Sequence, residues 1–156
     1  MKTLLPVATA FALLAAPAFA EGDAEAGAQA FNQCQTCHIV ADADGNTLAG
    51  RNAKTGPNLY AVIGRQAGTY EGFRYGKDLV EAGEKGLVWD QATFVEYVQD
   101  PQAFLKTTLG NNRARGQMQF RVRTAADAEN LYAFLVSLAP PAEDAEAEGE
   151  AAPVSN

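Results

Sequence analysis

The sequence predicts a small all-α protein of about five short helices joined by loops. Three observations lead to this prediction: apolar residues recur at helical spacing in several segments, glycine-rich stretches separate those segments, and no convincing strand pair or internal repeat occurs. Five short helices make a small core for a chain of 156 residues. A bulky apolar group inside the fold would complete that core.

The first 20 residues have the pattern of a secretory signal peptide. Lys2 gives a positive start, residues 4–15 are almost entirely apolar, and Ala18 and Ala20 are the small residues that precede a cleavage site. The alternative is a membrane anchor, but the apolar stretch is shorter than the roughly 20 residues that a spanning helix needs. We therefore expect an exported protein whose mature chain begins at Glu21.

Charge divides the mature chain into two parts. Without Lys2 the chain has 11 basic and 19 acidic residues, a net charge of −8. Residues 141–156 hold five of the acidic residues, no basic one and no aromatic side chain, which predicts a disordered acidic tail. The domain over residues 21–140 is left with a net charge of −3. A nucleic-acid-binding domain is typically basic, so nucleic acid is not an expected partner.

The first three helices are expected over residues 23–37, 58–66 and 76–86. The first is rich in alanine, a strong helix former, and places Gly27 and Phe31 on one face. The stretch between the first two helices has the composition of a loop.

Two longer helices are expected in the second half of the chain. Asp90 can cap a helix over residues 90–100, which Pro101 ends. Thr124 can cap the last helix, which lies within residues 123–141. The apolar stripes of these two helices consist of Phe94, Val95 and Val98, and of Leu131, Phe134, Leu135 and Leu138.

The chain's only two cysteines and its only histidine stand within five positions, at Cys34, Cys37 and His38. A disulfide across two residues is typical of redox-active dithiols, but the βαβ context of those enzymes is missing. A structural zinc site takes four protein ligands, and no other cysteine or histidine remains. Covalent haem attachment uses two such thiols for the haem vinyl groups and the adjacent imidazole for the iron. The cluster therefore favours one haem c with its iron over a disulfide or zinc.

Met118 is the candidate for the second axial ligand of that iron. It is the one methionine beyond the signal peptide, and it follows a predicted loop over residues 109–116. A lone methionine is ordinarily a core side chain, but its neighbours Gln117 and Gln119 are polar. Because a second histidine is missing, the thioether is the soft ligand that a six-coordinate haem iron needs.

A positively charged segment surrounds Met118. No acidic residue lies between Asp100 and Asp127. The alternative is a solvated loop whose charges only aid solubility. The functional interpretation is a surface that steers an acidic redox partner toward the haem edge. Its five basic residues are Lys106, Arg113, Arg115, Arg121 and Arg123.

These features together resemble the class I c-type cytochromes, most closely the bacterial cytochromes c2 and c-550. The resemblance covers nearly the whole mature chain, through GDAEAGAQAFNQCQTCH, KTGPNLYAVIGRQAGTYEGFRYG, VWDQATFVEYVQDP and the C-terminal helix. It implies a fold wrapped around one haem. The first and last helices would cross at positions that match Gly27, Phe31, Leu131 and Phe134.

The resemblance also implies roles around the haem. The carbonyl of Pro57 would accept a hydrogen bond from His38 and fix its ring. Relatives often have a threonine just before the methionine, whereas Gly116 and Gln117 stand here, so that hydrogen bond to a haem propionate is not expected. The residues that match propionate contacts are Tyr75, Trp89 and Arg65, and Tyr97 matches the tyrosine beside the methionine.

The function implied by the resemblance is that of a monomeric, periplasmic one-electron carrier, not an enzyme. It would take electrons from the cytochrome bc1 complex and pass them to a cytochrome oxidase or a photosynthetic reaction centre. A haem peroxidase would need a vacant or labile sixth site. A gas-binding haem protein would typically have its motif near the C-terminus of a four-helix bundle, whereas Cys34 lies near the mature N-terminus.

Overall fold

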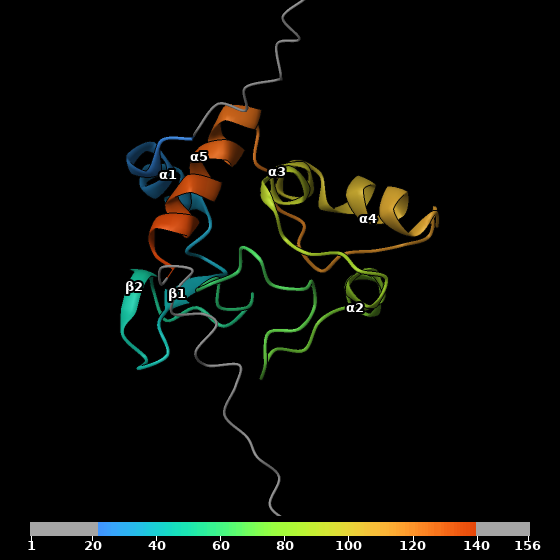
Figure 1. Cartoon of the computed structure of the whole chain (residues 1–156), viewed down its shortest axis with the longest axis horizontal. Coiled ribbons are helices and arrows are strands. Elements are labelled where there is room, and N and C mark those ends of the chain that lie inside the picture. The colour runs from blue at the N-terminus through green and yellow to red at the C-terminus, as the bar shows by residue number, and fades with distance from the viewer. Residues whose placement is uncertain (1–21, 140–156) are drawn as a thin grey trace, which may run out of the picture.

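The computed structural model describes residues 22–139 (Figure 1). The expected signal peptide (1–20) and acidic tail (141–156) lie outside the described residues. In chain order the elements are α1 (Ala24–Ala30), the 3₁₀ turn η1 (Phe31–Gln33), β1 (Ile39–Ala41), β2 (Thr47–Gly50), α2 (Lys77–Glu84), α3 (Gln91–Gln99), α4 (Pro101–Leu109) and α5 (Ala125–Ser137).

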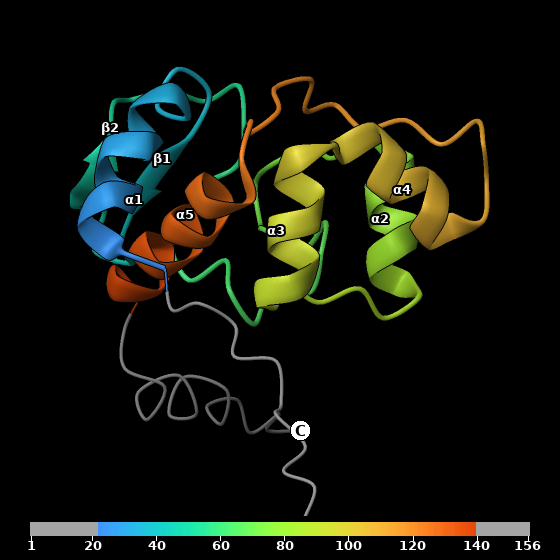
Figure 2. The ribbon, with the colours of Figure 1, turned by 90° about the horizontal axis from the view of Figure 1, so that it is seen from above.

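The five α-helices confirm the expected fold class and form two groups that meet at α3. Figures 1 and 2 show α1 and α5 side by side at one end, α2 and α4 at the other, and α3 between them. No helix within residues 22–139 is long and apolar enough to cross a membrane. The helices thus surround the centre of the molecule, and long loops cover the parts of the centre that the helices leave open.

A short hairpin corrects the expectation that the chain has no strand pair. Strands β1 and β2 pair antiparallel, with Val40 opposite Ala49. A tight turn joins them, in which the Asp42 carboxylate accepts a hydrogen bond from the backbone N–H of Asn46 (2.8 Å). Val40 is completely buried, so one residue anchors this hairpin in the core. Strands of three and four residues are too short to show an alternating pattern in the sequence.

Helices α1 and α5 cross at the residues that the sequence indicated. A Cβ atom at Gly27 would lie 2.0 Å from the carbonyl oxygen of Asn130, so only glycine permits this approach. The rings of Phe31 and Phe134 pack with their centroids 5.4 Å apart. The predicted cap of α5 is also present, because the Thr124 hydroxyl accepts from the backbone N–H of Asp127 (3.1 Å).

The helix expected over residues 58–66 does not form. Its backbone instead bonds to the segment before α3. The N–H of Gly64 donates to the carbonyl of Trp89 (2.8 Å), and the N–H of Trp89 donates to the carbonyl of Arg65 (3.0 Å). Ala61 has a positive φ of 48°, which no α-helix accommodates. The apolar residues Leu59 and Val62 of this segment line the central cavity instead.

Pro101 begins a helix as well as ending one. Asp90 caps α3 as predicted, with its carboxylate accepting from the N–H of Thr93 (2.8 Å). Pro101 is then the first residue of α4, a position where proline's missing N–H is not needed. The expectation of loop before Met118 holds from Gly110 onward, whereas Leu109 still belongs to α4.

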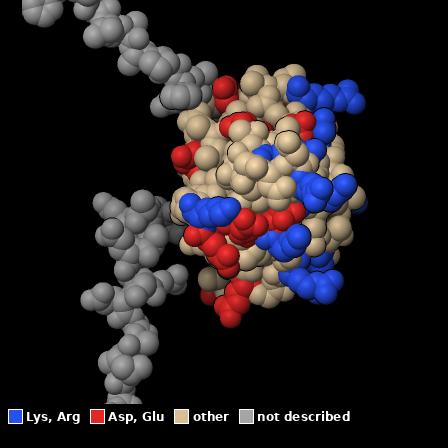
Figure 3. Space-filling model, turned by 90° about the vertical axis from the view of Figure 1, so that its right-hand side faces the viewer, with Lys and Arg blue, Asp and Glu red and all other residues tan. Residues whose placement is uncertain are grey.

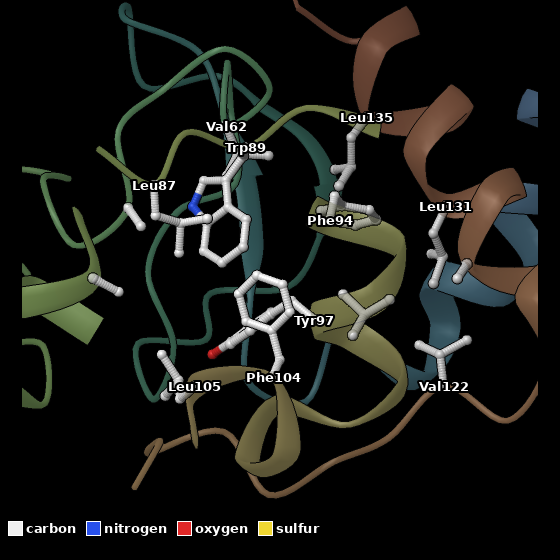
Figure 4. Close-up of a cluster of buried hydrophobic side chains, with 14 of the residues drawn as sticks. Val62, Leu87, Trp89, Phe94, Tyr97, Phe104, Leu105, Val122, Leu131 and Leu135 are labelled. Carbon is white, nitrogen blue, oxygen red and sulfur yellow. The ribbon is translucent and has the colours of Figure 1, made fainter. Parts of the chain in front are cut away.

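The core lies between the helices and contains an aromatic cluster. The ring centroids of Trp89 and Tyr97 are 4.8 Å apart, and Phe104 packs edge-on against Tyr97 at 5.6 Å. Figure 4 shows Leu131 and Leu135 of α5 facing this cluster from the opposite side. The space between these two walls is the site described next.

Candidate functional site

One cavity brings the predicted cofactor residues together. Its volume is about 580 Å³, and its walls come from the segment after α1, the long loops, α3, the loop after α4, and α5. All nine residues that the sequence assigned to a cofactor line it. They are Cys34, Cys37, His38, Pro57, Arg65, Tyr75, Trp89, Tyr97 and Met118.

Both cysteines face this cavity from one helical turn. The backbone N–H groups of Cys37 and His38 donate to the carbonyl of Cys34 (3.0 and 2.9 Å), so the thiols lie one turn apart on one side. The thiols are free, not joined in a disulfide. Burial, with a smaller effect of Cys37, raises the pKa of the Cys34 thiol to about 11. A redox-active dithiol needs a lowered pKa, so the burial of Cys34 does not favour that alternative.

Zinc is also not favoured. Within residues 22–139, no group of three or more histidine, cysteine, aspartate or glutamate side chains could hold a metal ion. The two thiols and the imidazole of the Cys34–His38 cluster thus have no carboxylate to complete a tetrahedral site.

The ring of His38 is held in the form that binds a metal. Its Nδ1 lies 2.9 Å from the carbonyl oxygen of Pro57. A carbonyl only accepts, so Nδ1 carries the proton and the Nε2 lone pair remains available. Burial lowers the pKa of His38, and the hydrogen bond to Pro57 opposes part of that shift. The imidazole is therefore neutral at neutral pH.

The backbone around Pro57 is fixed by its neighbours. The N–H of Gly56 donates to the carbonyl of Cys37 (2.7 Å), and that of Leu59 donates to the carbonyl of Ile39 (2.9 Å). A Cβ atom at Gly56 would lie 2.4 Å from the His38 ring, so glycine is required here. The short distance between ring and carbonyl thus follows from the local sequence.

Met118 enters the cavity from a loop far along the chain. Its side chain is partly buried and packs against the core cluster. Tyr97 lines the same cavity and is buried to 8% exposure. Burial raises the pKa of the Tyr97 hydroxyl to about 12, with Tyr75 adding to the effect, so this hydroxyl stays protonated.

Arg65 brings a positive charge to the cavity wall. Its guanidinium donates to the carbonyls of Asn58 (3.1 Å) and Tyr60 (3.2 Å) and lies 4.9 Å from the centre of the Tyr70 ring. Among the described residues no carboxylate pairs with it. Burial lowers the pKa of Arg65 and raises that of Tyr75. A half-buried cation at an otherwise apolar cavity fits a ligand with an anionic group.

Part of the cavity wall was not predicted from the sequence. Leu59, Val62 and Leu79 line it, although Leu59 and Val62 were expected within a helix over residues 58–66. Apolar residues in so short a segment do not distinguish a helix from a loop that lines a cavity. The exposed residues that line its opening are Gln33, Thr36, Thr55, Gln66, Gln117, Gln119 and Phe120.

The five basic residues around Met118 are all exposed, and none lines the cavity. Arg121 forms an ion pair with Asp100 (3.1 Å), an aspartate that borders the segment in sequence. Figure 3 shows the face that includes α2 and α4, with most of its lysine and arginine side chains along one edge.

The site as a whole fits a covalently held haem. Two thiols lie one helical turn apart, a neutral imidazole and a thioether line the same cavity, and mostly apolar walls with one half-buried cation surround them. These features, in a small all-α fold, define a c-type cytochrome.

Known proteins agree with this class. Cytochrome c2 of Cereibacter sphaeroides is 57% identical over 141 residues, which cover 89% of this chain and 95% of that protein. Cytochrome c-551 of Roseobacter denitrificans is 52% identical over 139 residues, covering 88% and 96%. The crystal structure of cytochrome c2 from Rhodobacter sphaeroides superposes with a TM-score of 0.76 at 57% identity, covering 78% of this chain and all of that one. No family model matches.

The chain belongs to the cytochrome c2 family of class I c-type cytochromes. It is a haem electron carrier with one haem c, and Cys34 and Cys37 are its attachment residues. The sequence-based prediction of family, fold class and cofactor is thereby confirmed.

Proposed function

We propose that this protein is a non-enzymatic one-electron carrier of the bacterial periplasm, with His38 and Met118 as the two axial ligands of its haem iron. One observation supports this most: His38, with its proton on Nδ1, and Met118 line the same cavity. His/Met ligation raises the reduction potential and leaves no open iron position for a substrate. The signal-peptide pattern of residues 1–20 supports the periplasmic location.

The haem supplies the redox-active iron, and this chain's residues hold it and set its surroundings. Pro57 keeps the His38 ring oriented through its carbonyl. Arg65, Tyr75 and Trp89 would hold a propionate at the cavity wall, since the Arg65 guanidinium has no carboxylate partner in residues 22–139. The apolar walls exclude water, so little has to rearrange when one electron enters or leaves.

The proposed route runs from the cytochrome bc1 complex to a terminal acceptor, a cytochrome oxidase or a photosynthetic reaction centre. The basic segment, Lys106 to Arg123, would steer acidic patches on those complexes toward the cavity opening, where Phe120 is 42% exposed. An exchange of this kind needs only a small, short-lived interface. One copy of the chain is sufficient for such an exchange, so we propose that the protein acts as a monomer.

Stopped-flow kinetics tests this function. We expect second-order reduction by purified bc1 complex and second-order oxidation by at least one acceptor, both slowed by salt. Arg113→Glu combined with Arg123→Glu should slow both about tenfold at low ionic strength, within the range of steering effects. The difference should shrink near 1 M salt, where the screening length is about 3 Å.

Two controls separate steering from other effects. Lys85→Glu reverses one charge at the end of α2, outside the basic segment, and should change the rates less than either single arginine reversal. Deleting residues 141–156 should change them far less than the double reversal. Equal rates for the double variant and the parent at low salt would show that the basic segment does not steer the partners. No electron exchange with any of the three complexes would contradict the function itself.

A further inference from the structure

The loop that carries Met118 is tied to a glutamine at the start of α4. Gln102 is the second residue of that helix and partly buried. Asp100 caps the first turn by accepting from the backbone N–H of Ala103 (3.0 Å). Proline at the first position also restricts this turn. Gln102 therefore stands on one of the most firmly held parts of the helix.

Both ends of the Gln102 side-chain amide bond the loop backbone. Its Oε1 accepts from the N–H of Gly116 (3.1 Å). Its Nε2 donates to the carbonyl oxygens of Gly116 (2.9 Å) and Met118 (3.3 Å). One side chain thus bonds the backbone on both sides of Gln117, including the carbonyl of Met118 itself. We name these three contacts the Gln102 clamp.

Other contacts hold the two ends of the loop. The buried Asp78 of α2 accepts from the N–H of Arg115 (2.7 Å). Further on, the N–H of Val122 donates to the carbonyl of Val98 in α3 (2.8 Å). Between these two anchors, in the part of the chain that the structure describes, Gln102 is the side chain from outside the loop that bonds its backbone. The contacts of Gln102 therefore hold the loop backbone between these anchors.

We propose that Gln102 is a positioning residue for Met118 and opposes displacement of its thioether by a competing ligand. The proposal rests on the proposed function, in which Met118 ligates the iron. A methionine that leaves has to carry the backbone of Gly116 and Met118 away from α4. That movement breaks the three contacts of the clamp. The Gly116 carbonyl would keep the bond from the Gln119 side chain (2.9 Å), but the N–H of Gly116 and the carbonyl of Met118 would lose their Gln102 partners, which opposes the movement.

Imidazole is the probe, added to the oxidised holoprotein while the weak iron–sulfur charge-transfer absorption is followed. Gln102→Met keeps the length of the side chain but removes its hydrogen bonds. We expect the affinity for imidazole to rise at least about fivefold, the ratio that corresponds to one net hydrogen bond. Gln102→Glu keeps an acceptor for Gly116 but places a carboxylate against two carbonyl oxygens, so its affinity should rise as well.

The matched control makes the same change on the neighbouring helix. Gln99 of α3 donates to the carbonyl of Val95 in its own helix (2.9 Å) and does not bond the loop. Gln99→Met should therefore leave the affinity for imidazole at the parent value. A rise equal to that of Gln102→Met would overturn the proposal, because any loss of glutamine would then suffice.

Amide hydrogen exchange gives a readout that does not depend on iron ligation. In Gln102→Met the N–H of Gly116 should exchange faster, whereas the N–H of Arg115, held by Asp78, should keep its rate. Equal acceleration at both amides would indicate general loosening and overturn the clamp. So would unchanged exchange at Gly116 together with unchanged imidazole affinity.

Ligation by Met118 and positioning by Gln102 can be tested separately. If the parent protein shows no iron–sulfur absorption, the ligation by Met118 is wrong, and exchange at Gly116 still decides whether the clamp exists. If that absorption is present and both Gln102 variants bind imidazole like the parent, the ligation stands and the positioning role is wrong.

Discussion

At the scale of single residues, the site is set by a few polar contacts inside an apolar wall. The Pro57 carbonyl decides which nitrogen of His38 carries the proton, and Gly56 makes room for that contact. The role of Pro57 could be predicted from the family resemblance, and its contact with His38 is present. The role of Gly56 was not predicted, because the close approach of the His38 ring is visible only in the structure. The Gln102 clamp could not be predicted, because the sequence does not indicate that a glutamine in a helix bonds a loop 14 residues further along the chain.

Tyr97 makes the first prediction, which concerns pH. Its pKa rises from 10.0 to about 12 on burial, so the unfolded chain loses this proton first as pH increases. The folded state then binds more protons, and stability falls between about pH 10 and pH 12 by about 2–3 kcal/mol. In Tyr97→Phe, the unfolding free energy should not include this contribution to the loss of stability between about pH 10 and pH 12.

Chemical denaturation of the holoprotein at several pH values between 9 and 12 measures this effect. The difference in unfolding free energy between parent and Tyr97→Phe should narrow or change sign as pH rises. A constant difference over that range would show that the hydroxyl of Tyr97 titrates alike in both states.

At the scale of elements, sequence patterns located helices better than they located the turns between them. Caps at Asp90 and Thr124 marked α3 and α5, because a capping side chain lies next to the amides that it satisfies. Two expectations were wrong for different reasons. The segment 58–66 bonds to a distant stretch before α3, which is a non-local cause. The start of α4 has a local cause, because Asp100 caps the helix and Pro101 takes its first position, where proline was expected only to end a helix.

The crossing of α1 and α5 makes the second prediction. Gly27→Ala should favour the helix by up to about 1 kcal/mol through propensity. The new Cβ, however, would lie 2.0 Å from the Asn130 carbonyl oxygen, and the helix backbone cannot move away cheaply. Overpacking costs about 1–3 kcal/mol or more, so we expect a net loss of about 2 kcal/mol in unfolding free energy.

Urea denaturation measures this loss, and Ala28→Ser is the control on an exposed position of the same helix. The control should stay within about 0.5 kcal/mol of the parent. A Gly27→Ala variant as stable as the parent would mean that the two helices can separate without cost.

At the scale of the whole molecule, the protein is a shell of short helices and loops around one large cavity. The five helices alone enclose a modest core, and a haem in the cavity completes it. The need for a bulky group in the core could be predicted from the sequence, because five short helices and abundant loop make a small core. The path of the loops could not be predicted, because their apolar side chains pack on the cofactor site and not on a regular neighbour.

The most direct test of the central claim is the visible spectrum of the reduced protein with and without carbon monoxide. If His38 and Met118 occupy both axial positions, adding carbon monoxide should leave the spectrum of the parent unchanged. Met118→Ala is the control: its haem should stay covalently attached, and carbon monoxide should shift its spectrum. Two results would contradict this ligation: a spectrum of the reduced parent protein that shifts when carbon monoxide is added, or a Met118→Ala variant that keeps the iron–sulfur absorption when oxidised.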